Sequence, residues 1–351
     1  FFNWINLVYA IGAVICIFAG NFTTLLVGLI IAGLASGADL PVSMTVVSHD
    51  APDDATAARL VSTTQVFWQV GVFISFICAF LVSTMSGATG GRVVFAILAV
   101  FAVIAWAWRV FSPTFRRFHE EADARDAARP ATSYNTGKTS VMKVLFGADK
   151  KVLLTYFLAI VIFYVGWNLL ANTWGQFQTY MFSKAGATQS LATGLGIILN
   201  LVTLVLNIVF ASIAGGKYRN KAFFVGIIIS VIAMIAMAMG GANLWVIVGA
   251  TAFMNLGSPL AGEALYKVWT QESFPIEIRA SVQGFINGFS RLCCGLFALI
   301  TPALVLPETI QATMWCFAAI VVVEGIAGTV MIRAQKKYGT DEERQFAKAN
   351  A

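Results

Sequence analysis

Long apolar stretches separated by short polar segments form the main pattern of this chain. A helix rises about 1.5 Å per residue, so about 20 apolar residues cross the hydrocarbon core of a bilayer. Lipid offers an irregular backbone no hydrogen-bond partners, and we therefore predict a membrane-spanning helix for each stretch. The stretches are residues 2–19, 23–47, 60–83, 93–111, 152–171, 190–214, 222–240, 244–268, 281–304 and 310–333.

The polar segments between the stretches carry most of the charge. Apolar residues make up 58% of the 351 residues and charged residues 11%, whereas a soluble domain carries about 25% charge. The 23 lysines and arginines outnumber the 17 acids, but they cluster between apolar stretches, so we expect no nucleic-acid partner. Most of them, including the run from Arg109 to Lys151, fall on the side that also carries both chain ends. We therefore predict an all-α integral membrane protein of the plasma membrane, in bacteria the inner membrane, with both ends cytoplasmic.

Sequence motifs for enzymatic chemistry are missing. The five cysteines lie inside apolar stretches, and the two histidines lie in polar segments without partners at metal-ligand spacing. No phosphate-binding glycine loop occurs. Asp39 is the one aspartate within a stretch, whereas an intramembrane aspartyl protease needs two. We expect no enzyme activity, no cofactor and no metal.

The polar segment 112–151 divides the apolar stretches into four and six. Its residues 116–129 form a charged helix, Pro130 ends that helix, and residues 141–146 are amphipathic enough to lie on the membrane surface. A solvated linker is the alternative. We predict residues 1–111 as the rest of an N-terminal bundle, 112–151 as a cytoplasmic linker, 152–335 as a C-terminal six-helix bundle and 336–351 as a cytoplasmic tail.

Two cytoplasmic hinges, six helices apart, share an acid, a proline and an arginine. Proline ends one helix, and the acid and the arginine can pair across the turn to hold the flanking helices in one arrangement. Such a repeat indicates two bundles of six helices, so we expect the sequence to be a fragment that lacks two helices before Phe1. The hinge residues are Asp50, Pro52 and Arg59 in the first and Glu272, Pro275 and Arg279 in the second.

The segment Glu272-Ser-Phe-Pro275-Ile-Glu-Ile-Arg279-Ala resembles the sugar-porter branch of the major facilitator superfamily, which has E-x-F-P-x-x-x-R-[GA] between its tenth and eleventh helices. The pattern from Gly33 through Gly37 to Pro41 and the pattern from Gln65 to Gly71 resemble further family motifs. The run before Glu272 resembles bacterial inositol and metabolite transporters. This resemblance implies two helical bundles built from parallel repeats, with helices 3 to 12 present here.

Helix 7 of that scheme carries Asn168, Asn172, Gln176 and Tyr180 at intervals of four residues, which places them on one helix face. Amides both donate and accept hydrogen bonds, as hydroxyl-rich ligands do. Hydrogen bonds between helices are the alternative. The resemblance implies that helix 7 amides bind a sugar, and Asn172 stands where the family has a sugar-binding asparagine.

Helix 5 adds two glutamines, and four aromatic residues are candidate stacking partners. The resemblance implies that Gln65 bonds to the sugar, and Gln69 follows it by one turn. Aromatic side chains can stack on the apolar face of a sugar ring, although tryptophans near helix ends are often interface anchors. The aromatic candidates are Trp68, Trp174, Tyr266 and Trp269.

Charges inside the apolar stretches are costly and mark functional positions. Asp39 and Glu263 each lie nine residues before a polar hinge, about 13 Å into the membrane, and we expect them to approach one cavity, where one or the other carries a proton. Glu263 precedes Lys267 by four residues, so local pairing is the alternative. Arg291 is a counter-ion for Glu263, a ligand for an anionic substrate, or a structural residue.

Together these features predict a secondary transporter, a monomer that moves a sugar or a cyclic polyol such as inositol by alternating access and coupling to protons. Its partners are the small-molecule substrate, protons and the bilayer. One alternative is an organic-anion transporter, which requires Lys267 and Arg291 to face the cavity unpaired. The other is a sensor that binds sugar without transporting it.

Overall fold

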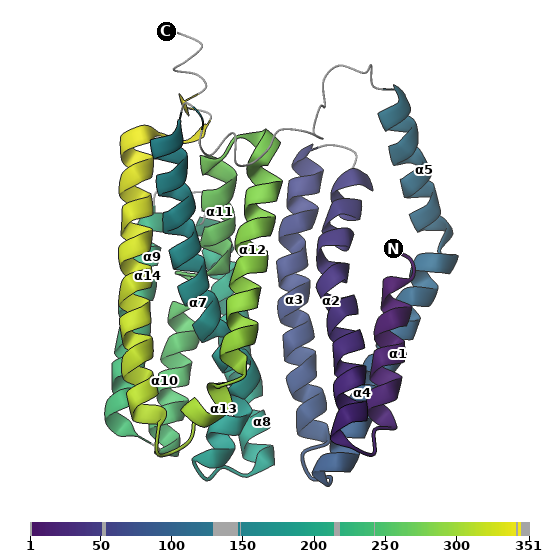
Figure 1. Ribbon diagram of the computed structural model, residues 1–351, viewed down its shortest axis with the longest axis vertical. Coiled ribbons are helices and arrows are strands. Elements are labelled where there is room, and N and C mark those ends of the chain that lie inside the picture. Colours follow the sequence, from purple (N-terminus) through teal and green to yellow (C-terminus); the bar gives the residue numbers. More distant parts are fainter. Residues whose placement is uncertain are drawn as a thin grey trace. The chain divides into compact units, whose positions relative to one another are not determined.

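The computed structural model describes residues 2–50, 54–128, 147, 149–213, 218–241, 243–341 and 343–344. Every regular element in these ranges is a helix (Figure 1), which confirms the all-α fold class. The chain divides into two compact units, Phe1–Ser133 and Tyr134–Ala351. Each unit has its own packing.

The first unit places α1 against both α2 and α4. Glycines make the contact between α1 and α2 close. A Cβ added to Gly12 would lie 2.8 Å from the carbonyl oxygen of Gly28, and a Cβ added to Gly28 would lie 2.5 Å from the sulfur of Cys16. Such small residues let apolar helices approach backbone to backbone. The helices of this unit are α1 (Ile5–Ile17), α2 (Phe22–Asp50), α3 (Asp54–Leu81), α4 (Gly87–Phe111) and α5 (Pro113–Ala128).

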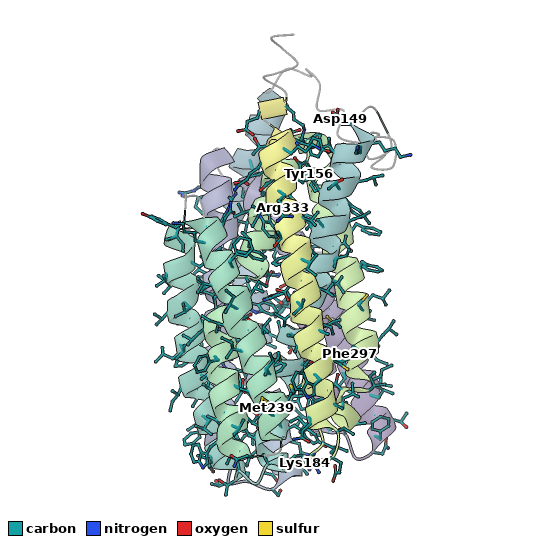
Figure 2. All side chains as sticks on the ribbon, turned by 90° about the vertical axis from the view of Figure 1, so that its left-hand side faces the viewer. Asp149, Tyr156, Lys184, Met239, Phe297 and Arg333 are labelled. Carbon is teal, nitrogen blue, oxygen red and sulfur yellow. The ribbon has the colours of Figure 1, made fainter. Side chains whose placement is uncertain are left out.

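The second unit is built around α7, which contacts α14, α12, α11 and α8. Buried aromatic side chains such as Phe163, Phe223 and Trp269 fill one part of its core, and methionines such as Met234 and Met314 fill another. Figure 2 places Tyr156 and Arg333 toward one end of this unit and Lys184 toward the other. Its helices are α7 (Lys150–Lys184), α8 (Gln189–Ile213), α9 (Arg219–Gly240), α10 (Leu244–Gly257), α11 (Glu263–Ser273), α12 (Ile276–Ala298), α13 (Thr301–Leu304) and α14 (Ile310–Tyr338).

Helix length and composition suit a multi-pass membrane protein. Within the described part of the chain, 6 helices are long and apolar enough to cross a membrane. Their outer faces carry large exposed apolar side chains, for example Ile228 and Ile232 on α9 and Val323 and Ile326 on α14. Such side chains match the hydrocarbon of a bilayer.

Several predicted helix bounds are wrong. The predicted span 281–304 is split into α12, which begins at Ile276 and ends at Ala298, and the short α13. The predicted span 244–268 is two helices, α10 and α11, separated by residues 258–262. Pro259 provides no backbone N–H to continue the helix, and the Ser258 hydroxyl accepts a hydrogen bond from the indole nitrogen of Trp167 at 2.9 Å. A Cβ on Gly262 would lie 2.5 Å from that indole nitrogen, so the turn requires glycine. The predicted span 152–171 is also too short, because α7 continues to Lys184.

Candidate functional site

A ladder of amide hydrogen bonds runs along α7. The side-chain nitrogen of Asn172 donates to the backbone oxygen of Asn168 at 2.8 Å and to its side-chain oxygen at 2.6 Å. Gln176 donates to the side-chain oxygen of Asn172 at 3.3 Å. Asn168 is buried, Asn172 is half-buried and Gln176 is exposed. The ladder therefore leads from the core of the second unit to an open surface.

The same ladder joins α7 to α12. Asn168 donates to the hydroxyl of Ser290, and Asn172 contacts the sulfur of Cys294 at 3.6 Å. The Asn168 amide thus has partners on both its nitrogen and its oxygen, as expected for hydrogen bonds that hold two helices together. The half-buried and exposed amides, Asn172 and Gln176, are better placed for a ligand than Asn168.

Arg291 lies beside this ladder on α12. Its guanidinium donates to the side-chain oxygen of Asn172 at 3.5 Å. One turn earlier on α12, Asn287 accepts a hydrogen bond from the hydroxyl of Tyr164 at 3.5 Å. The crevice between α7 and the C-terminal end of α12 is filled by its lining side chains and has no room for a water molecule, so it is not itself a ligand cavity. Its lining residues are Leu169, Asn172, Thr173, Gln176, Phe177, Cys294, Phe297, Ala298 and Thr301.

Most of the aromatic stacking candidates lie in the core. Trp269, Tyr266 and Trp174 are at most 4% exposed, and Tyr266 stacks on Tyr164 at 3.8 Å between ring centroids. These three rings are covered by other protein atoms and offer no free face to a sugar. Their predicted stacking role is therefore wrong. Trp68, at 54% exposed on α3, has an open ring.

In the first unit, Asp39 on α2 forms an ion pair with Arg109 on α4. Their closest atoms are 2.7 Å apart, and Ser43 bonds to both side chains at 3.0 and 3.2 Å. Arg109 also donates to the backbone oxygen of Phe2 at 3.0 Å, and its guanidinium lies 4.3 Å from the Phe2 ring centroid. We predicted Arg109 to be a cytoplasmic loop cation and did not predict its pairing with Asp39, because 70 residues separate Arg109 from Asp39.

The glutamines of α3 belong to the same unit. Gln69 is buried, at 8% exposed. The Gln65 side chain, the Arg59 side chain and Pro52 lie outside the part of the molecule that the structure describes. The first hinge therefore stays a prediction, as does the sugar-binding role of Gln65.

Glu263 pairs with Lys267 at 3.0 Å, one turn along α11. Glu263 therefore pairs locally, as the alternative predicted. Lys267 is paired as well, so it does not meet the requirement of an unpaired cation for organic-anion transport. Arg291 forms no ion pair with any residue that the structure describes. Asp39 and Glu263 belong to different units, and their approach to one cavity stays a prediction.

The second hinge pairs differently from the prediction. Glu272 accepts hydrogen bonds from Arg219 at 2.7 and 3.0 Å and from Gln335 at 3.2 Å. Arg279 instead donates to the backbone oxygen of Phe274 at 3.2 Å and to Gln271 at 3.4 Å. The predicted Glu272–Arg279 pair is wrong because Arg279, in the first turn of α12, turns back to the end of α11. Arg219 is the first residue of α9 and lies 53 residues before Glu272. The only sequence signal for this partner was the basic segment in which Arg219 lies.

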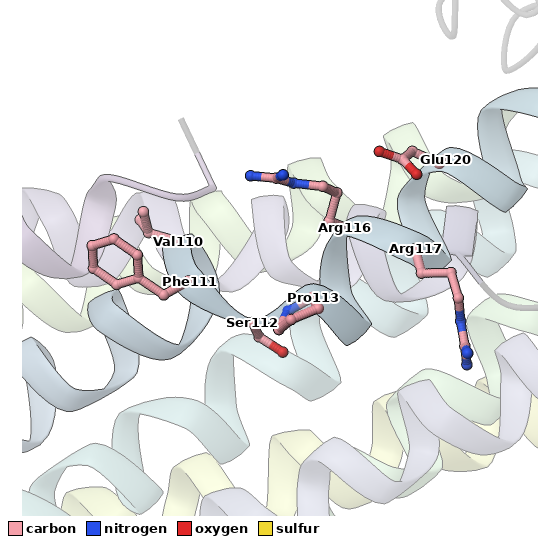
Figure 3. Close-up of a pocket in the computed structure, with 7 residues that line it drawn as sticks. All are labelled: Val110, Phe111, Ser112, Pro113, Arg116, Arg117 and Glu120. Atoms are coloured by element: carbon pink, nitrogen blue, oxygen red, sulfur yellow. The ribbon is translucent and has the colours of Figure 1, made fainter.

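A separate cavity of about 220 Å³ opens where α4 meets α5 (Figure 3). Arg116, Arg117 and Glu120 line it from α5, and Ser112 and Pro113 form the kink between the helices. Among the predicted substrate-binding residues whose side chains the structure describes, none lines this cavity. The charged helix predicted for residues 116–129 corresponds to α5.

Three comparisons relate this chain to known proteins. The family model of the Major Facilitator Superfamily matches residues 1–298. The minor myo-inositol transporter IolF of Bacillus subtilis (strain 168) is 29% identical over 306 residues, which are 85% of this chain and 67% of that protein. This family and this relative are transporters and not enzymes.

Solved structures share the fold at low sequence identity. A D-xylose–proton symporter has a TM-score of 0.71 at 13% identity, over 92% of this chain and 78% of the symporter. A peptide transporter, POT, has a TM-score of 0.67 at 16% identity, over 95% of this chain and 80% of the transporter. At such identities the likeness concerns the arrangement of helices.

Proposed function

Because this chain belongs to the Major Facilitator Superfamily, we propose that it is a secondary transporter that moves a sugar or a cyclic polyol such as inositol. The observation that carries the proposal is the amide ladder of α7, with Asn172 and Gln176 at its open end. The similarity to a myo-inositol transporter over 85% of the chain supports this substrate class. Transport proceeds by alternating access, coupled to protons.

Neutral amides suit a polyol because each offers donors and an acceptor to vicinal hydroxyls. Asn172 donates a hydrogen bond to Asn168 and accepts one from Gln176. A bound hydroxyl replaces the long 3.3 Å bond from Gln176 and leaves the short bond to Asn168 intact. Gln65 and Gln69 on α3 add further amides to the proposed substrate residues. The buried Asn168 accepts hydrogen bonds from the Asn172 amide and so fixes its orientation.

Two paired carboxylates are the proposed proton carriers. A proton on Asp39 removes the charge that holds Arg109, and a proton on Glu263 does the same for Lys267. Each event changes the electrostatic balance at one helix pair, which is the kind of local change that biases a two-state protein. The proposed coupling residues are therefore Asp39, Glu263 and their partners.

We propose the same organisation that the segment pattern predicts. Residues 1–111 belong to the N-terminal bundle, 112–151 to a cytoplasmic linker, 152–335 to the C-terminal bundle and 336–351 to a cytoplasmic tail. The protein works as a monomer in a plasma membrane, with both ends of this segment in the cytoplasm. The Glu272 and Arg219 pair and the two proline hinges then lie on the cytoplasmic side and control conformational cycling.

Counterflow of labelled myo-inositol into vesicles that contain the full protein tests the proposal. Unlabelled myo-inositol inside the vesicles is expected to drive transient accumulation of label, and an inward proton gradient is expected to raise the initial rate. A sensor would bind the label and show no counterflow. Empty vesicles of the same lipid composition are the control, and equal label in both samples would contradict the proposed function.

A further inference from the structure

We propose that Arg291 is an anion-recognition residue of the candidate substrate site, and that the preferred substrate is a sugar acid, a polyhydroxylated molecule with one carboxylate. This inference rests on the proposed function and adds a carboxylate to the polyhydroxylated substrate. It differs from the organic-anion alternative because it needs a single unpaired cation. The hydroxyls of the substrate are bound by the amides of α7.

The three faces of α12 identify the environment of Arg291. One face is buried in the second unit and includes Ile286, Ser290 and Cys294. Another carries large exposed apolar side chains, Phe285, Phe289, Leu292 and Leu296, which suit lipid. Between these faces lies a strip of polar and small residues at helical spacing, made of Gly284, Asn287, Gly288, Arg291 and Gly295. Arg291 thus stands on the polar strip and not on the lipid-like face.

The strip around Arg291 is open. Among the described residues, no atom outside the surrounding turns of α12 would lie within 4 Å of a Cβ added to Gly284, Gly288 or Gly295. The same holds for Gly175, which precedes Gln176 on α7. These glycines leave room for a ligand to approach the α12 backbone on both sides of the guanidinium.

The charge of Arg291 and most of its N–H donors have no partner among the described residues. Within the described part of the chain it has no carboxylate partner, whereas Asp39, Glu263 and Glu272 each have a cationic one. Its hydrogen bond to Asn172 is long, at 3.5 Å, and a guanidinium has five N–H donors. An unpaired charge at membrane depth is costly, so a substrate carboxylate that binds in bidentate geometry would stabilise it.

The neighbouring groups define the rest of the substrate. Asn172 accepts from Arg291 and donates to Asn168, and Gln176 donates to Asn172, so a carboxylate at Arg291 brings the adjacent hydroxyls to these amides. A phosphate ester carries a charge of about −1.5 to −2 and would leave charge unbalanced at a single guanidinium. One cation beside neutral amides therefore favours a carboxylate over a phosphate.

The test compares two sugars that differ only at carbon 6, D-glucuronate with a carboxylate and D-glucose with a hydroxymethyl group. Binding to the full protein in detergent is measured by isothermal titration calorimetry. Wild-type protein is expected to bind D-glucuronate about tenfold or more tightly than D-glucose. Arg291→Gln is expected to abolish this preference by weakening D-glucuronate binding, while D-glucose binding changes by less than about threefold. Arg291→Lys keeps the charge and is expected to retain part of the preference.

Lys184→Gln is the matched control, because it removes one positive charge from the C-terminal residue of α7, outside the amide ladder, and is expected to keep the preference for the acid. Equal binding of both sugars by wild-type protein, or equal weakening of both by Arg291→Gln, would overturn the inference. In either case binding of myo-inositol would leave the proposed function standing. If the protein binds neither sugar nor myo-inositol, the proposed function is wrong, and this inference with it.

Discussion

Glu272 and Arg219 form a bidentate ion pair, in which one terminal guanidinium nitrogen donates to one carboxylate oxygen at 2.7 Å and the other donates to the second oxygen at 3.0 Å. The pair joins the end of α11 to the first residue of α9, and Gln335 on α14 bonds to the same carboxylate. Three helix ends of the second unit therefore meet at one side chain. A bidentate pair of this kind is directional as well as strong.

Removal of this pair is expected to change transport rate more than substrate affinity. Arg219→Gln or Glu272→Gln frees the helix ends from one another without touching the amide ladder, so the initial rate of counterflow should change severalfold while the Kd for myo-inositol stays within about twofold. Rates come from vesicle uptake and Kd values from calorimetry. The charge exchange Arg219→Glu with Glu272→Arg should restore part of the rate. A Kd change as large as the rate change would contradict this role.

Asn172→Ala is expected to weaken myo-inositol binding. Each lost hydrogen bond to a neutral hydroxyl costs about 0.5–1.5 kcal/mol, which is roughly a two- to thirteenfold rise in Kd. Asn168→Ala is the contrasting variant, because its buried amide holds Ser290 and Asn172 and its loss should lower the thermal midpoint more. Calorimetry and thermal unfolding in detergent distinguish the two. A silent Asn172→Ala would remove the main support for the polyol site.

Asp39→Asn is expected to destabilise the first unit. The variant leaves the Arg109 guanidinium, with a side chain 16% exposed, without its anionic partner. Hydrogen bonds to charged groups contribute about 1.5–3 kcal/mol, so unfolding should occur at a lower temperature. The double variant Asp39→Asn with Arg109→Gln removes both charges and should recover part of the loss. Additive effects of the two single changes would show that the pair does not stabilise the unit.

The turn between α10 and α11 is expected to tolerate no side chain at Gly262. An added Cβ would contact the Ser258 carbonyl and lie 2.5 Å from the indole nitrogen of Trp167. Gly262→Ala should therefore lower the free energy of unfolding by about 1–3 kcal/mol. Gly249→Ala, in the α10 helix with open space around it, is the control and should be neutral or stabilising by up to about 1 kcal/mol. Equal thermal midpoints for the two variants would contradict the close packing of this turn.

The long-range pairs could not be predicted from local patterns. Spacing along one helix identified Glu263 and Lys267, because residues four apart lie on the same face whatever surrounds the helix. The partners of Asp39 and Glu272 lie 70 and 53 residues away, and only helix packing brings them close. Arg279 had the right distance in sequence for Glu272, but the start of α12 turns it toward the Phe274 backbone.

The sequence by itself determined the all-helical membrane fold, since the length and apolarity of each stretch meet the requirements of a bilayer without reference to other segments. It also determined which amides share a face of α7, because helical periodicity alone places Asn168, Asn172 and Gln176 in line. Only the tertiary structure decided which of these amides is buried against Ser290 and which is open, and which charges are neutralised. Burial and charge pairing depend on the neighbouring helices, and many weak contacts along the whole chain determine how those helices pack.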